Sequence, residues 1–300
     1  MSTPWDLWDL SPAEQQARLG AMADHGIDHV FTADHISFMD GSGMDGLVHL
    51  AALSSLEPRL DLYVGVYLLA LRHPMIAARQ IASLAQVAPG RVTIGVGVGG
   101  EDRHEIEVCE IDPKTRGRRT DAALFAVRSL LTGRPVDGDG AFFEFRQGVI
   151  KPAPEPKVPF VVGGRSDAAI DRAARLGDGW LAAWCSSRRF AEGVARVEDR
   201  GAARRNSWHH GLQLWVGVGD SSTDARQYVA SAMQRFYGLG FELFERYTPM
   251  GTAADIAEFL VPYVEAGAET LNLTPCGPDR EIELETMAEV RRLLARPEQG

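Results

Sequence analysis

Asp34 and His35 are the residues best suited to acid–base chemistry, because they stand side by side directly after a predicted strand. The apolar run at 28–33 predicts that buried strand. A histidine changes its charge near neutral pH and can therefore move a proton, and a neighbouring carboxylate can orient it. The same pair can also act as a polar plug, in which the carboxylate only holds the histidine in place. The residue types leave both roles open.

Glycine is concentrated at the end of a second predicted strand, at 92–98, where Gly95, Gly97, Gly99 and Gly100 follow one another closely. Glycine at alternate strand positions removes the side chains from one face of a sheet. That face is then flat, as a planar ring system lying against it requires. Tight packing of a helix on the strand is the alternative explanation.

Two further glycine sites predict ligand contacts. Ser166 as N-cap and Gly177 as stop predict a helix at 167–176. Gly163, Gly164 and Arg165 lie between a predicted strand and this helix, where free backbone N–H groups and a guanidinium can bind a phosphate. A plain tight turn followed by a helix cap is the alternative. Gly65 and Val66 lie inside a predicted strand, where a glycine indicates a bulge, a close approach to a ligand or packing inside a barrel.

The elements that must position these residues alternate along the chain. Strands followed by helices predict right-handed βαβ units and a parallel sheet, so the fold class is α/β. We expect a (β/α)8 TIM barrel, whose functional groups lie at the carboxyl ends of its strands. An open doubly wound sheet is the alternative, but its usual Gly-x-Gly-x-x-Gly sequence is absent after the first strand. The predicted strands lie at 28–33, 62–69, 92–98, 160–162, 180–184, 212–218 and 270–274.

The pattern departs from a complete barrel in two places. A barrel needs eight strands and nothing before Ser11 predicts the first, so this strand is either missing or atypical. An insertion around 135–160 interrupts the alternation, and within it we expect a hairpin with arms at 141–145 and 148–150. We expect the whole chain, 1–300, to form a single domain, since barrels of this length are common.

Composition excludes several classes of protein. The shares of 45% hydrophobic and 24% charged residues are typical of a globular protein, and the net charge of -10 disfavours nucleic acid and membrane as partners. Three widely spaced cysteines without a visible secretory signal favour a cytoplasmic location. No His-x-His or His-Glu-x-x-His motif predicts a metal site. None of the three lysines clearly ends a barrel strand, which argues against Schiff-base chemistry.

Taken together, these motifs resemble the luciferase-like monooxygenase superfamily and, within it, the branch that depends on the deazaflavin coenzyme F420. The resemblance implies a (β/α)8 barrel with an insertion, usually a homodimer. The unassigned first strand departs from that pattern: either a segment is lost, or residues 5–10 fill its place differently. The matching segments are GIDHVFTADH (26–35), LYVGVYLLALRHPMIAARQIASL (62–84), GRVTIGVGVGG (90–100), IKPAPEPKVPFVVGGRSDAAIDRAARLGDGW (150–180) and MGTAADIAEFL (250–260).

The resemblance also implies roles for the residues singled out above. It implies that Asp34 and His35 lie against the deazaflavin ring, with His35 as the acid/base or ring-positioning residue. It implies a cis peptide bond between Gly65 and Val66 that supports the ring from behind. It further implies a ring pocket and a phosphate site, formed respectively by Gly97, Gly99 and Gly100 and by Gly163, Gly164 and Arg165.

The function implied is hydride transfer between F420 and an unidentified small organic substrate. Two alternatives stay open: an FMN-dependent monooxygenase that works with a separate reductase, and a non-catalytic barrel that binds a flavin without turnover. A metal-dependent hydrolase is a more distant alternative. The loops expected to form the substrate pocket match no substrate-specific pattern.

Overall fold

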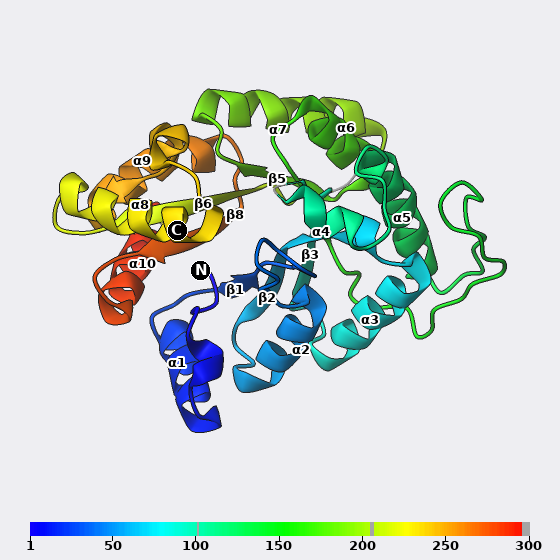
Figure 1. Ribbon diagram of the computed structural model, residues 1–300, viewed down its shortest axis with the longest axis horizontal. Coiled ribbons are helices and arrows are strands. Elements are labelled where there is room, and N and C mark those ends of the chain that lie inside the picture. Colours follow the sequence, from blue (N-terminus) through cyan, green and yellow to red (C-terminus); the bar gives the residue numbers. More distant parts are fainter. Residues whose placement is uncertain (101, 205–206, 296–300) are drawn as a thin grey trace, which may run out of the picture.

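The computed structural model describes residues 1–100, 102–204 and 207–295. Parallel strands form the centre of the molecule and helices surround them (Figure 1), which is the expected α/β fold. The strands are β1 (His29–Thr32), β2 (Asp61–Tyr67), β3 (Val92–Val96), β4 (Phe160–Gly163), β5 (Gly179–Ala183), β6 (Gly211–Val218), β7 (Met250–Gly251) and β8 (Thr270–Cys276). The helices are α1 (Pro12–Asp24), α2 (Gly46–Leu56), α3 (Pro74–Val87), α4 (Arg103–Glu107), α5 (Arg116–Leu130), α6 (Asp167–Leu176), α7 (Ser187–Gly201), α8 (Ser222–Tyr237), α9 (Ala253–Glu265) and α10 (Arg280–Leu294).

Residues 1–3 close the barrel. The strands pair in parallel in the order β1, β2, β3, β4, β5, β6 and β8. Between β8 and β1, the Ser2 amide donates to the Leu273 carbonyl, and the Thr3 amide donates to the Phe31 carbonyl, both at 2.9 Å. Residues 1–3 therefore occupy the place of the unassigned first strand, which is atypical rather than missing.

The suggestion that residues 5–10 fill that place is wrong. Leu7–Asp9 form a 3-10 helix instead, because the amides of Leu7 and Asp9 donate to carbonyls three residues earlier. The three residues Met1, Ser2 and Thr3 are too few to show the alternation of apolar and polar side chains from which a strand is predicted.

Three elements were not expected from the sequence: strand β7 and the helices α2 and α4. Strand β7 has only two residues and pairs with Gly217 and Val218 at the carboxyl end of β6. Helix α2 is apolar on most of its surface, so it shows no helical periodicity. Its start is nevertheless well defined, because the Asp45 carboxylate accepts from the amides of Leu47 and Val48.

The insertion between α5 and β4 projects from the barrel beyond α5 (Figure 1). Its arms meet in one antiparallel bridge between Val136 and Gly148. The expected hairpin arms at 141–145 and 148–150 are wrong, because the Asp139 carboxylate accepts from the amides at 141–143 and makes the turn there. The Phe143 side chain is buried and anchors the loop.

Helix α6 spans the expected residues, and it lies at the carboxyl end of β4. The Ser166 hydroxyl accepts from the Ala169 amide at its start, and Gly177 follows its last residue. Ile170 and Ala173 bury its apolar face in the barrel core. Among the described residues, no helix combines the length and apolar character needed to cross a membrane.

Candidate active site

A cavity of about 610 Å³ opens at the carboxyl ends of the barrel strands. This volume lies within the usual range of small-molecule sites. Arg165 is not part of its lining, but the other predicted site residues are brought together there from the ends of β1, β2, β3 and β4. They are Asp34, His35, Gly65, Val66, Gly97, Gly99, Gly100, Gly163 and Gly164.

The His35 ring is held by Glu105, a buried carboxylate on α4. His35 Nδ1 lies 3.3 Å from Glu105 Oε1, and the same oxygen accepts from the Ile36 amide at 2.7 Å. Because an ionised carboxylate only accepts, Nδ1 must carry the proton. The other ring nitrogen, Nε2, then has a free lone pair, as a general base needs.

Helix α4 also holds the loop that follows His35. The Met39 amide donates to Asp102 Oδ2 at 2.8 Å, and the His35 amide donates to the Met44 carbonyl at 3.0 Å. Two segments nearly seventy residues apart, 35–44 and 102–105, therefore dock together around the histidine.

Asp34 binds Arg72 rather than the His35 ring. Its oxygens accept from Arg72 at 2.7 and 2.8 Å, and from the amides of Gly46 and Leu68, both at 2.8 Å. The side chain is fully buried. Burial raises the pKa of the Asp34 carboxyl, while Arg72 and the two amides act in the opposite direction. The ion pair ties β1, the start of α2 and the segment after β2 together beneath the histidine.

The Val66 side chain explains why positions 97 and 163 are occupied by glycine. The Gly65–Val66 peptide bond is cis, as the resemblance implies. A Cβ atom on Gly97 would lie 2.3 Å from Val66 Cγ2, and one on Gly163 would lie 2.6 Å from Val66 Cγ1. Close packing thus accounts for Gly97 and Gly163, although the partner is a strand side chain and not a helix. The resulting wall of backbone and one isopropyl group suits the face of a planar ring.

We expect Gly97→Ala to lower the free energy of unfolding by about 1–3 kcal/mol, because the added methyl group overlaps Val66. Urea denaturation of the cofactor-free protein measures this. In the double variant Gly97→Ala/Val66→Ala the overlap is removed. Its loss of free energy of unfolding should therefore be smaller than the sum of the losses in the two single variants. Additive losses would show that the two side chains do not compete for this space.

The predicted phosphate site lies at the edge of the cavity, with Gly163 and Gly164 in the lining and Arg165 outside it. The Gly164 amide already donates to the Leu181 carbonyl at 3.1 Å, so it is not a free donor. The first-turn amides of α6 are the donors left at this edge. Arg165 is exposed beside them, and the nearby Asp167 carboxylate is paired with Arg189 and Arg196. The edge therefore stays favourable for an anion.

A second histidine in the cavity wall, His49 on α2, is neutral. The Trp8 indole N–H donates to His49 Nε2 at 3.0 Å, so the ring proton is on Nδ1, which lies 2.6 Å from the Thr32 hydroxyl. Burial lowers the pKa of His49 to about 4. These contacts fix the ring in the wall and leave it without charge at neutral pH.

Three histidines whose pKa is lowered by burial predict a loss of stability in weak acid. Burial lowers the pKa of His49 and of His210 to about 4 and that of His29 to about 3, below the ordinary value of 6.5. Below pH 6.5 the unfolded chain therefore binds more protons than the folded chain. We expect the contribution of these histidines to the free energy of unfolding to be level above this pH and to fall by about 1 kcal/mol per pH unit for each histidine below it. Burial also lowers the pKa of the Met1 ammonium from 8.0 to about 5, so this group adds a loss of the same sign that begins below pH 8.

Urea denaturation between pH 7.5 and 5 tests this expectation. The variant His210→Gln removes one titrating group, so its stability should depend less steeply on pH than that of the parent protein. An unchanged slope would show that His210 does not contribute.

Sequence reasoning missed three residues of this site: Glu105, Arg72 as the partner of Asp34, and Gln213, whose amide donates to the Gly65 carbonyl at 3.1 Å. Gln213, a polar residue inside the predicted strand at 212–218, was the one visible signal. In the described part of the chain, no group of three or more His, Cys, Asp or Glu side chains is placed to hold a metal ion.

Known proteins share both the sequence pattern and the fold. An uncharacterised protein of Mycobacterium tuberculosis is 37% identical over 145 residues, which cover 48% of this chain and 50% of the relative. An F420-dependent glucose-6-phosphate dehydrogenase of Beutenbergia cavernae is 31% identical over 198 residues, or 64% of this chain and 59% of that enzyme. The chain thus spans about half the length of the curated relatives that it matches.

The barrel also matches solved structures. An F420-dependent secondary alcohol dehydrogenase, solved with an F420–acetone adduct, superposes with a TM-score of 0.80 at 18% identity, covering 96% of each chain. The family described as luciferase-like monooxygenase matches residues 7–271. That match includes nearly all the barrel and every predicted site residue, so the chain belongs to the luciferase-like monooxygenase family.

Proposed function

We propose that the protein is an oxidoreductase that transfers a hydride between coenzyme F420 and a small organic substrate. One observation carries this proposal: a single cavity joins the free Nε2 of His35 to the flat wall at Val66. A planar ring fits against that wall, and the edge at α6 offers backbone amides and Arg165 for the phosphate of the cofactor side chain. The residues present therefore fit a deazaflavin.

When bound, F420 supplies a ring carbon that accepts or returns a hydride. His35 Nε2 takes the proton that the substrate loses in the oxidising direction, and Glu105 stabilises the cation that forms. The cavity walls would hold the ring and the substrate next to each other and would shield the reacting atoms from water. Asp34 acts through the backbone, by holding the loop that carries His35.

Two of the relatives support F420 as the cofactor, and FMN stays the alternative. The Beutenbergia cavernae enzyme and the secondary alcohol dehydrogenase both carry F420 in their names. Titration of the purified protein with oxidised F420 and with FMN, followed by cofactor fluorescence, tests this choice. We expect a micromolar dissociation constant for F420 and binding of FMN that is at least about tenfold weaker. Micromolar affinity for FMN alone would overturn the proposal in favour of the monooxygenase.

The same titration tests the phosphate edge. Arg165→Ala should weaken F420 about tenfold, the effect of one charge-assisted hydrogen bond. Arg188→Ala is the matched control, because this arginine is almost fully exposed and contacts only Glu192, at 3.9 Å, among the described ion pairs.

We also infer that the protein forms a homodimer through α2 and α3. These helices pack against each other (Figure 1) and expose the apolar side chains Val48, Ile76 and Val87. Sedimentation at micromolar concentration is expected to give a dimer, and Ile76→Glu is expected to shift it toward monomer. A monomeric parent protein would contradict the inference.

A further inference from the structure

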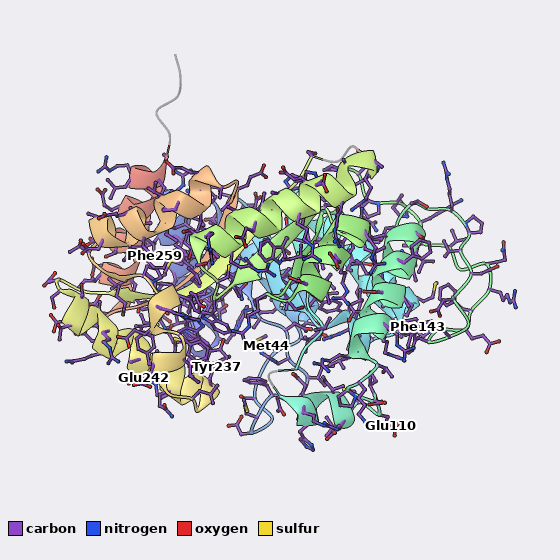
Figure 2. The ribbon with its side chains drawn as sticks, turned by 90° about the horizontal axis from the view of Figure 1, so that it is seen from above. Met44, Glu110, Phe143, Tyr237, Glu242 and Phe259 are labelled. Atoms are coloured by element: carbon purple, nitrogen blue, oxygen red, sulfur yellow. The ribbon has the colours of Figure 1, made fainter. Side chains whose placement is uncertain are left out.

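The cavity has a second wall, opposite in character to the glycine wall, and it is built from aromatic rings. The rings come from the N-terminal segment, the loop after β1, the end of β5, strand β6 and the end of α8. Tyr237 of α8 and Met44 of the loop after β1, both labelled in Figure 2, line the cavity. The aromatic wall consists of Trp5, Phe38, Trp184, Trp215, Phe236 and Tyr237.

The aromatic wall is continuous and begins beside the general base. Phe38 lies 4.2 Å from the His35 ring and 5.5 Å from Phe236, between ring centroids. Phe236 lies 4.7 Å from Tyr237, which lies 5.6 Å from Trp184. A molecule that presents its reacting carbon to His35 must therefore place the rest of its body against these rings.

Among the described residues, the lining of the cavity offers no lysine or arginine side chain to the body of such a molecule. The two carboxylates of the lining are already engaged, Asp34 by Arg72 and Glu105 by His35 and backbone amides. His49 is neutral, because burial lowers its pKa to about 4.

This charge distribution disfavours an anionic substrate. A phosphate group moved from water to the aromatic wall would lose its hydration and gain no counter-charge, and the nearby carboxylates would repel it. An uncharged aromatic or alicyclic body loses little hydration and gains apolar contacts there. The cavity thus differs in chemistry from a site suited to glucose 6-phosphate, the substrate named for the Beutenbergia cavernae relative.

We propose that the aromatic wall binds an uncharged aromatic or alicyclic secondary alcohol, or the corresponding ketone, and excludes sugar phosphates. This inference rests on the proposed function for its chemical step. In that step the alcohol C–H bond breaks and both its electrons leave with the hydrogen as a hydride to oxidised F420. The O–H proton passes to His35 Nε2, and the carbon–oxygen double bond of the ketone forms. The alcohol is oxidised by two electrons and the deazaflavin is reduced by two.

Ligand-observed NMR titration of the cofactor-free protein tests the binding half of the inference, with acetophenone and glucose 6-phosphate as probes. We expect saturable acetophenone binding with a dissociation constant below about 1 mM, and no saturable binding of glucose 6-phosphate. Phe236→Ala should weaken acetophenone at least tenfold, and Phe236→Leu, which keeps an apolar side chain and the helix, should weaken it less. Phe125→Ala, an exposed phenylalanine on α5, is the matched control and should change nothing.

Glucose 6-phosphate that binds as tightly as acetophenone would overturn the inference, and so would acetophenone binding that is unchanged in Phe236→Ala. The chemical step is read separately, from the loss of the visible absorbance of oxidised F420 on addition of 1-phenylethanol. If F420 fails to bind while acetophenone binds at the aromatic wall, the proposed function fails and the substrate-class inference stands. If F420 binds and glucose 6-phosphate is the better reductant, the inference fails and the proposed function stands.

Discussion

An alanine in place of His35 is expected to lower kcat/KM for hydride transfer between about 100-fold and 10,000-fold. Among the described residues that line the cavity, the other histidine is His49, whose Nε2 already accepts from the Trp8 indole, so it does not replace His35 as a base. F420 affinity should change by no more than about threefold, because the flat wall at Val66 and the edge at α6 are untouched. Reduction of F420 by 1-phenylethanol and the F420 titration measure the two quantities.

Two controls separate proton transfer from simple loss of structure. Added imidazole should restore part of the rate of His35→Ala, since the deleted ring leaves space for it. Glu105→Gln keeps an acceptor for Nδ1–H and removes the negative charge, so it should cost only about tenfold. An undiminished rate in His35→Ala would remove His35 from the mechanism. Absence of turnover in the parent protein with every alcohol tried, despite tight F420 binding, would favour the non-catalytic barrel.

The largest expected loss of stability is that of Arg72→Met, at about 3–5 kcal/mol. Its guanidinium neutralises Asp34, whose side chain has no exposed surface, and also binds Asp45 at 2.8 Å. Methionine has similar length and no charge, so Asp34 is left as an uncompensated buried carboxylate. The lost stacking on Tyr67, whose ring lies 4.2 Å from the guanidinium carbon, adds to the cost.

Urea denaturation at pH 7 measures this loss against Arg103→Met, which breaks the exposed pair with Glu107 and should change stability little. The double variant Arg72→Met/Asp34→Asn removes the stranded charge and should recover part of the stability. If Arg72→Met lowers the free energy of unfolding no more than Arg103→Met does, the Asp34–Arg72 ion pair does not hold β1 to α2 and β2.

The sequence predicted those elements whose signals are local. Helix α6 was predicted at its observed bounds because Ser166 and Gly177 mark its ends. Helix α2 was missed because its apolar residues occupy most of its surface, and β7 because two residues form no pattern. Residues 1–3 take the place of a barrel strand only through hydrogen bonds to β8 and β1, which are distant in sequence. Pairing of this kind cannot be predicted from the local pattern of apolar and polar residues.

The same distinction applies to the candidate site. Asp34 and His35 were found because they end a strand, and the glycines because they are dense. The partners of His35 and Asp34 were not found. Glu105 and Arg72 reach them only because α4 and the segment after β2 lie beside the end of β1 in the folded chain. The sequence paired Asp34 with His35 as neighbours, whereas the structure gives each a different long-range partner.

The docking of segment 35–44 against 102–105 has a consequence for how substrates are discriminated. His35 has a single tautomer only while Glu105 accepts its Nδ1 proton, and Asp102 keeps the two segments together through the Met39 amide. Under the proposed function, we expect a molecule that keeps the two segments apart to bind at the aromatic wall but to react slowly, because Glu105 then no longer holds the Nδ1 proton of His35. We expect selectivity of this kind to appear in kcat and not in affinity.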